Sequence, residues 1–357
     1  MRTLTIDLEA IVHNYKTMLA RTDAALLPVI KANAYGHGMV PVARALDAAG
    51  VDAFGVADVQ EALALRDAGI KAPILAWLHD PEDNFVAALA GNVDLGIANL
   101  EQLERIVAAA TSTGITAKLH LKIDTGLGRN GSSAAAWPAL LESVKGAAAS
   151  ELVEVVGIFS HLSGTSEADD LAQIERFDAA VAVADQMGVA YQVRHLTASD
   201  GSLAYPQAHY DMVRVGIALY GLDPFSAHRA SEYGLKPAMT AKAKVVQTKV
   251  VEAGQGVSYG YLHTTKTQST LALVPIGYAE GLPRNATGSA HVSLNGKTYP
   301  ISSRVAINDA VADLLAHGRY VNPAIQALVS PFQADRSVFF INFFDFWRSA
   351  RAGVRRT

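Results

Sequence analysis

The sequence of 357 residues contains no cysteine. This absence excludes disulfide bonds, thiolate zinc sites, cysteine-ligated iron–sulfur clusters and any mechanism in which a thiol is the base or the nucleophile. The histidine, aspartate and glutamate residues show no spacing typical of metal ligands, so we predict no metal site. Any base or nucleophile must be another kind of side chain.

An excess of one charge sign is also missing, since 30 lysine and arginine residues stand against 34 aspartate and glutamate residues. This balance provides no basic surface for nucleic acid. No segment reaches the roughly 18 apolar residues that span a bilayer. Asp7 and Glu9 interrupt the N-terminus, which therefore lacks the apolar core of a signal peptide. We expect a cytoplasmic protein that binds neither nucleic acid nor a membrane.

Short apolar runs alternate with alanine-rich amphipathic segments over the first two thirds of the chain. The runs are residues 26–30, 53–57, 73–78, 94–98, 118–123, 155–159, 193–196 and 212–221. This alternation predicts repeating βα units rather than hairpins. Eight units fit a (β/α)8 barrel of the TIM type, and a doubly wound open sheet is the alternative that periodicity leaves open.

The pattern changes near residue 235, where strand-like segments with glycine and proline replace the long amphipathic ones. Asn295-Gly296 lies between two alternating segments and predicts a tight hairpin. The predicted fold class is therefore α/β, with an N-terminal (β/α)8 barrel domain over residues 1–234 and a mostly β domain over residues 235–357.

Polar side chains follow several predicted strands, where barrel enzymes gather their reactive groups. Lys31 directly follows the first run and precedes a glycine-rich loop, so a desolvated amine there is a candidate for a Schiff base; a surface lysine is the ordinary alternative. The glycines of segment 126–131 formally match a dinucleotide fingerprint, but they follow the fifth strand. We favour a loop that presents Arg129 to a carboxylate.

Hydroxyl, histidine and arginine side chains extend this pattern. His161 and the segment 195–201 end two later strands with groups suited to phosphate oxygens or to ring stacking, although lone histidines are more often structural. Arg214 lies inside an apolar run and needs a partner, because an unpaired buried charge is costly. In the second domain, Tyr259 and Tyr278 are flanked by glycine, and alone they indicate only core or edge aromatics.

Eight segments, taken together, resemble alanine racemase, the two-domain fold-type III family that uses pyridoxal 5′-phosphate. They are VIKANAYGHG (29–38), KIDTGLGRNG (122–131), FSHL (159–162), HLTASDG (195–201), YDMVRVGIALYG (210–221), GVSYGY (256–261), VPIGYAEGLPR (274–284) and, more loosely, SRVAINDAVADL (303–314). They occur in the family's order. No single segment would support the resemblance as strongly as the ordered set does.

The resemblance implies a homodimer that interconverts L-alanine and D-alanine and supplies the D-isomer for peptidoglycan. Lys31 would hold the cofactor and act as one acid/base, and Tyr259 of the partner subunit would act as the other. Racemisation removes a proton from one face of Cα and returns a proton to the other face, so two groups must lie on opposite sides.

The cofactor-binding residues implied by the resemblance are Lys31, Tyr35, Arg129, His161, Ser199, Arg214 and Gly216. Tyr35, Ser199 and Gly216 would hold the phosphate. Arg214 would lie against the pyridine nitrogen, and His161 would support the ring. An arginine keeps its charge and does not readily give up a proton, which would limit side reactions such as transamination.

Two residues are implied for substrate binding. Arg129 would contact the phenolic oxygen of the cofactor and orient the substrate carboxylate. The main chain of Ile307 would contact the substrate where the family has methionine.

The sequence departs from the family pattern at Ala198, Ser303 and Asn308, and most of all over the final ~40 residues, which are rich in phenylalanine and arginine. Tyr320 is the last tyrosine, and its context does not match the family's phosphate-contacting one. A divergent paralogue with weak or no racemase activity, or a racemase for another amino acid, is therefore the alternative. The related decarboxylases need a cysteine from the second domain, which this chain lacks.

Overall fold

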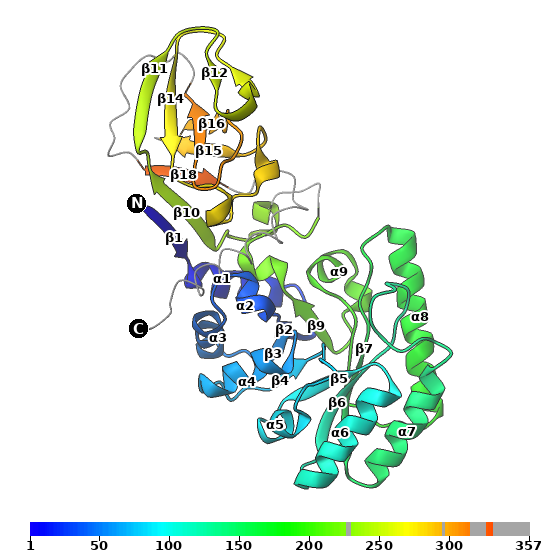
Figure 1. Cartoon of the computed structure of the whole chain (residues 1–357). Coiled ribbons are helices and arrows are strands. Elements are labelled where there is room, and N and C mark those ends of the chain that lie inside the picture. Colours follow the sequence, from blue (N-terminus) through cyan, green and yellow to red (C-terminus); the bar gives the residue numbers. More distant parts are fainter. Residues whose placement is uncertain (226–229, 295–296, 315–325, 331–357) are drawn as a thin grey trace. The chain divides into compact units, whose positions relative to one another are not determined.

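The computed structural model describes residues 1–225, 230–294, 297–314 and 326–330. The chain divides into two compact units, one of residues Leu8–Pro237 and the other of Met1–Asp7 with the chain from Ala238 onward (Figure 1). Residues 1–7, which we place in the barrel domain on sequence grounds, thus group with the second unit. The reason is that β1 (Arg2–Ile6) pairs antiparallel with β10 (Met239–Lys244).

The first unit contains eight parallel strands at the predicted positions. They are β2 (Ala25–Pro28), β3 (Phe54–Val56), β4 (Ile74–Ala76), β5 (Asp94–Ile97), β6 (Ala117–Lys122), β7 (Val153–Phe159), β8 (Val193–His195) and β9 (Met212–Val215). Strands β3 to β8 pair in chain order, and β2 pairs with β9. A parallel bridge from Val29 to Gly55 joins β2 to β3. Asp211 N donates to the Arg194 carbonyl at 3.1 Å beside β8 and β9, which completes the ring. The predicted barrel is confirmed over the open sheet.

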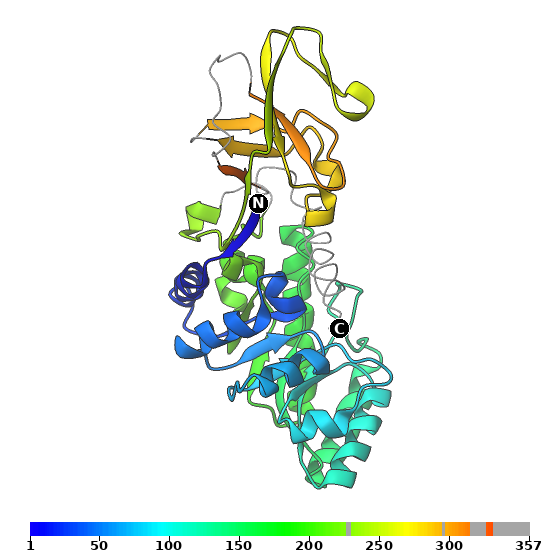
Figure 2. The ribbon, with the colours of Figure 1, turned by 60° about the vertical axis from the view of Figure 1, so that its left-hand side comes forward.

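Helices follow the strands and lie outside them, as the two views show (Figure 2). They are α1 (Leu8–Leu19), α3 (Met39–Ala48), α4 (Val59–Asp67), α5 (Phe85–Ala90), α6 (Leu100–Thr113), α7 (Trp137–Ala149), α8 (Glu167–Gln186) and α9 (Ser199–Ala204). Side-chain caps begin α4, α5, α6 and α8, where Asp58, Asn84, Asn99 and Ser166 accept bonds from backbone N–H groups. Each cap ends the preceding loop at a fixed residue.

Two glycines make room for Trp77 at the wall of the barrel. A Cβ on Gly96 would lie 2.9 Å from the Trp77 Cβ, and a Cβ on Gly55 would lie 2.8 Å from the indole ring. Because atoms cannot approach so closely, both positions need a residue without a side chain. Trp77 can therefore lean across two strands and form part of the cavity described below.

The second unit is built of antiparallel strands, as predicted. One sheet has the order β1-β10-β18-β15-β16 and another the order β11-β14-β17, with β12 and β13 as a separate pair. The remaining bounds are β11 (Gln247–Val251), β12 (Gly256–Val257), β13 (His263–Thr264), β14 (Ser269–Val274), β15 (His291–Leu294), β16 (Lys297–Pro300), β17 (Ala310–Asp313) and β18 (Gln326–Ser330). Leu294 pairs with Lys297, which confirms the predicted hairpin. The turn residues 295–296, Tyr320 and the tail 331–357 lie outside the described residues.

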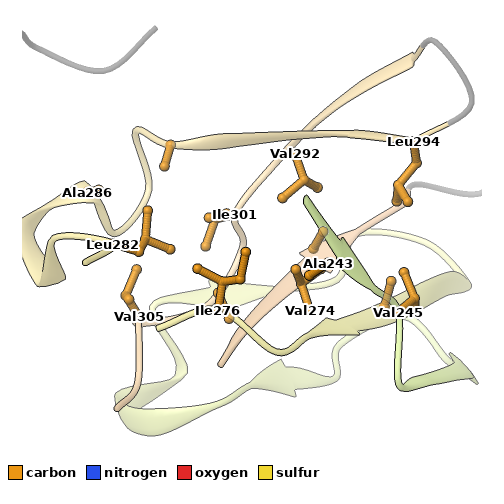
Figure 3. Close-up of a cluster of buried hydrophobic side chains, with 14 of the residues drawn as sticks. Ala243, Val245, Val274, Ile276, Leu282, Ala286, Val292, Leu294, Ile301 and Val305 are labelled. Carbon is orange, nitrogen blue, oxygen red and sulfur yellow. The ribbon is translucent and has the colours of Figure 1, made fainter. Parts of the chain in front are cut away.

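The core of this unit lies between its two larger sheets. Val292 of β15 points toward Val274 of β14, and Leu294 of β15 points toward Val245, with Ile276 and Ile301 in the same cluster (Figure 3). All of these side chains are buried. Within the part of the chain described here, no helix is long and apolar enough to cross a membrane.

Replacing Trp137 with alanine is expected to lower the free energy of unfolding by about 3–5 kcal/mol. Its indole is 2% exposed and donates a hydrogen bond to the Ala180 carbonyl of α8 at 2.9 Å, so the change opens a cavity between two helices and removes that bond. Urea unfolding followed by circular dichroism measures the loss. Leu171→Ala on the exposed side of α8 is the control, and an equal loss there would contradict the expectation.

Candidate active site

A cavity of about 260 Å³ lies in the barrel unit. All seven residues that the resemblance implies for the cofactor are among its lining residues. The lining is Val29, Lys31, Tyr35, Trp77, Lys122, Arg129, Phe159, His161, Ala198, Ser199, Asp200, Arg214, Gly216, Ile217 and Pro224. These residues follow or end six different strands, so the fold gathers side chains that are far apart in the sequence.

The cavity is rich in positive charge, since Lys31, Lys122, Arg129 and Arg214 line it with one carboxylate, Asp200. Burial lowers the pKa of Lys31, and the nearby Arg129 and Arg214 lower it further. Burial and Arg214 also lower the pKa of Lys122 to about 8. Burial raises the pKa of Asp200, which opposes its ionisation. This setting suits an anionic ligand and a lysine that loses its proton more readily than an exposed one.

Lys122 is absent from our sequence-based site. It ends β6, and its ammonium lies 5.4 Å from the centre of the Phe159 ring. The sequence carried the same signal as at Lys31, a lysine at the end of an apolar run.

Lys31 opens a short helical segment of unusual handedness, α2 (Lys31–Tyr35). Ala32, Asn33, Ala34 and Tyr35 all have positive φ, between 52° and 55°. Left-handed helical backbone costs roughly 1–2 kcal/mol for each residue that carries a Cβ. Bonds within the segment offset part of this, including Gly36 N to the Ala32 carbonyl at 3.1 Å. The strained turn brings Tyr35 into the same cavity as Lys31, only four residues away.

Gly216, Ser199 and Tyr35 form a compact polar corner of the cavity. Gly216 N donates to the Ser199 hydroxyl at 3.1 Å. A Cβ at position 216 would collide with the Tyr35 hydroxyl, so only glycine fits there. Burial raises the pKa of Tyr35 to about 12, which keeps its hydroxyl a donor. Two hydroxyls beside an open backbone are suited to phosphate oxygens.

Arg214 of β9 is buried, and both terminal nitrogens of its guanidinium make hydrogen bonds. One terminal nitrogen donates to the carbonyls of Ser160 at 2.7 Å and Leu196 at 2.8 Å and lies 3.1 Å from His161 Nδ1. The other donates to His195 Nδ1 at 2.9 Å. Burial lowers its pKa to about 9, so the guanidinium stays charged at neutral pH. These partners resolve the problem that the sequence posed, a charge within an apolar strand.

The bond from Arg214 sets the proton positions of two buried histidines. Because an arginine only donates, His195 Nδ1 must accept, and His195 Nε2 must carry the hydrogen. That nitrogen lies 2.9 Å from His120 Nδ1, which accepts in turn. The remaining His120 nitrogen lies 3.8 Å from a carboxylate oxygen of Asp94. Burial and Arg214 hold the pKa of His195 well below its usual range, so it stays neutral.

Sequence reasoning missed His120 and Asp94. The available signal was a polar residue inside each of two apolar strands, at residues 118–123 and 94–98. That signal shows a buried polar group but does not show its partner. His195 appeared only within the implied segment 195–201, without an assigned role.

Tyr259 and Ile307 belong to the second unit, where both are exposed. Tyr259 begins a single 3-10 turn and is 71% exposed, and Ile307 is 55% exposed. The Ile307 carbonyl accepts a bond from Ala279 N at 2.8 Å, which fixes its main chain. An exposed tyrosine hydroxyl in a short turn is available to another molecule.

The departures from the family pattern are built into this unit. Ser303 is buried, and its hydroxyl accepts a bond from Val311 N at 2.8 Å. The Asn308 amide donates to Glu280 at 3.1 Å, and Glu280 also pairs with Arg2 at 3.1 Å. Both altered side chains therefore support the loop that holds Ile307. Among the described residues, no group of three or more histidine, aspartate or glutamate residues could hold a metal ion.

Comparison with known proteins identifies relatives along nearly the whole chain. The alanine racemase N-terminal domain model matches residues 6–224, and the alanine racemase C-terminal domain model matches residues 238–330. An alanine racemase of Salinispora tropica is 44% identical over 313 residues, covering 86% of this chain and 83% of the relative. That of Thermobifida fusca is 43% identical, covering 87% and 83%.

Solved structures agree. Alanine racemase from D-cycloserine-producing Streptomyces lavendulae matches with a TM-score of 0.88 and 39% identity, covering 92% of this chain and 87% of that one. Alanine racemase from Streptomyces coelicolor A3(2) matches with a TM-score of 0.90 and 36% identity, covering 97% and 95%. The chain therefore belongs to the alanine racemase family and is an amino-acid racemase.

Proposed function

We propose that this protein interconverts L-alanine and D-alanine with pyridoxal 5′-phosphate as its cofactor. It acts as a homodimer in the cytoplasm, where D-alanine is supplied for peptidoglycan. The observation that carries the proposal is the meeting of all seven implied cofactor residues in one cavity. The identity to proteins named alanine racemase supports the choice of substrate.

The cavity fits this cofactor in charge and in shape. Tyr35, Ser199 and the open backbone at Gly216 would hold its phosphate, and the surrounding cations would balance the negative charge. Arg214 would face the ring nitrogen, held there by its bonds to the Ser160 and Leu196 carbonyls. When bound, pyridoxal 5′-phosphate supplies an electron sink for the pair left behind by the Cα proton.

Lys31 and Tyr259 of the partner subunit would move the protons. The lowered pKa of Lys31 increases the fraction of the amine that is unprotonated and able to take the Cα proton from one face of the substrate. The partner's Tyr259 would return a proton to the opposite face, and its exposed position makes its hydroxyl available for this. Arg129 would pair with the substrate carboxylate. This pairing would fix how the Cα–H bond is oriented relative to Lys31 and the partner's Tyr259.

Arg214 would also prevent unwanted proton transfer to the ring nitrogen of the cofactor. Its guanidinium stays charged and only donates, so it does not hand a proton to the ring nitrogen. His161 and His195 both have pKa values held well below the usual range by burial and by Arg214, so they do not act as acids there. None of these three residues would therefore compete with Lys31 and the partner's Tyr259 for proton transfer.

Incubating L-alanine with the protein and added cofactor in deuterated buffer tests the proposal. We expect the circular dichroism of the amino acid to fall to zero while mass spectrometry shows one deuterium at Cα. Borohydride should attach the cofactor to Lys31. Deuterated amine without a carboxylate would indicate a decarboxylase, whereas unchanged L-alanine would indicate a binding protein or a racemase for another amino acid, which a panel of L-amino acids would identify.

A further inference from the structure

We infer that Glu61 is a positioning residue for Lys31: its carboxylate anchors the left-handed turn after the lysine and places a negative charge at the start of that turn. This inference rests on the proposed role of Lys31. Glu61 lies in the first turn of α4, and neither the sequence motifs nor the cavity lining includes it.

Both oxygens of the Glu61 carboxylate are used. One accepts a bond from Ala57 N at 2.9 Å, where β3 leads into α4. The other accepts a short bond from Ala32 N, the first left-handed residue after Lys31. The N–H of Glu61 itself donates to the Asp58 cap at 2.8 Å, which fixes the first turn of α4. Glu61 thus connects a rigid helix start to the strained turn.

The chain contains a second copy of this helix start that lacks the extra contact. In α6, Gln102 N donates to the Asn99 cap at 2.9 Å, and the side-chain oxygen Oε1 of Gln102 accepts a bond from Ala98 N at 2.8 Å. This is the same reciprocal cap made with one oxygen. Capping the helix therefore does not require the second oxygen of Glu61. Its partner, Ala32 N, explains why a carboxylate is present at this position.

The left-handed turn needs such an anchor. Four consecutive residues with positive φ persist only where the surrounding structure holds them. Asn33 restrains the turn on one side, since its side-chain oxygen accepts a bond from Met39 N at 2.8 Å. The bond from Ala32 N to Glu61 restrains the turn closest to Lys31, because Ala32 is the next residue in the chain.

The charge of Glu61 also acts on Lys31. Arg129 and Arg214 lower the pKa of Lys31, and Lys122 and His161 face the same group. Glu61 raises the pKa of Lys31 against them. Asp58 faces Glu61 in turn and, after burial, helps to raise the pKa of that carboxyl. The carboxylate thus offsets part of the cationic field around the lysine.

Glu61→Gln tests the inference, with Gln102→Ala as the matched control. Glutamine retains an oxygen for Ala57 N, as Gln102 does in α6, but its amide group cannot accept from Ala32 N. In the full-length chain freed of cofactor, we expect the midpoint pH for acetylation of Lys31 to fall by about half a unit or more. Peptide mass spectrometry measures it. Amide hydrogen exchange over residues 31–36 should rise about tenfold.

Gln102→Ala should leave both readouts unchanged, because it removes only the cap of α6. Glu61→Asp provides a second variant, which keeps the charge but withdraws the carboxylate by one methylene; it should speed exchange while shifting the midpoint less. Unaltered acetylation and exchange in Glu61→Gln, or equal changes in Gln102→Ala, would overturn the inference. Neither readout involves alanine or the cofactor, so failure of the proposed function would be seen separately.

Discussion

Lys31→Ala is expected to reduce racemisation by about 10⁴-fold or more in both directions. The change removes the amine that would hold the cofactor and one of the two groups that would move the Cα proton. Lys122 lies over Phe159 of another strand, and an arginine such as Arg129 is not a base, so we expect neither to replace the Lys31 amine. A chiral assay of the D- and L-alanine formed over hours measures the residual rate.

The control is Lys71→Ala, which removes an exposed lysine outside the cavity and should leave the rate unchanged. Adding a small primary amine to Lys31→Ala offers a second check. If the loss is chemical rather than structural, the free amine should restore a measurable part of the rate. A variant with more than a tenth of the original rate would disprove the role of Lys31.

Tyr259→Phe is expected to slow exchange of the Cα proton of L-alanine by about 100-fold or more, while exchange from D-alanine changes by less than about tenfold. Phenylalanine keeps the ring and removes the hydroxyl, so the group that takes the proton from the L-isomer is lost. Lys31 would still remove and return a proton on its own face. Overall racemisation rates in the two directions are tied by the equilibrium constant, so exchange into deuterated solvent is the measurement to use.

Tyr261→Phe is the matched control for that variant. Tyr261 lies two residues further along the same turn and is 69% exposed, and its ring packs against Gly256. Phenylalanine preserves this packing, so exchange from both isomers should stay near the original rates. Equal losses from L- and D-alanine in Tyr259→Phe would contradict the assignment of opposite faces.

Much of the fold could be predicted from local patterns. The eight apolar runs coincide with β2 to β9, because strands covered on both faces read as continuous apolar segments. The hairpin at β15 and β16 followed from two turn residues. The pairing of β1 with β10 could not be predicted. Arg2 and Ala243 pair although they lie far apart in the sequence, and no local pattern in either segment indicates its partner.

Site residues that follow a strand could be predicted from the sequence. Contacts between residues far apart in the sequence could not. Lys31 and Arg129 follow apolar runs and were visible. The Glu61 cap of α4 could be read from Asp58 three residues earlier, but its bond to Ala32 joins positions that no local pattern connects. The left-handed turn was equally hidden, because alanine and tyrosine carry no preference for positive φ.

The one-way series of hydrogen bonds from Arg214 through His195 to His120 constrains how this protein can evolve. Arg214 can only donate, so His195 Nδ1 must accept and the bond from His195 Nε2 to His120 Nδ1 cannot reverse its direction. Losing His195 leaves a buried nitrogen of Arg214 and one of His120 without this partner, and losing His120 leaves His195 Nε2 without its partner, which costs more than the bond itself. Neighbouring residues of this series must therefore be replaced together if the protein is to keep its fold. The new side chains must again place a donor opposite each acceptor.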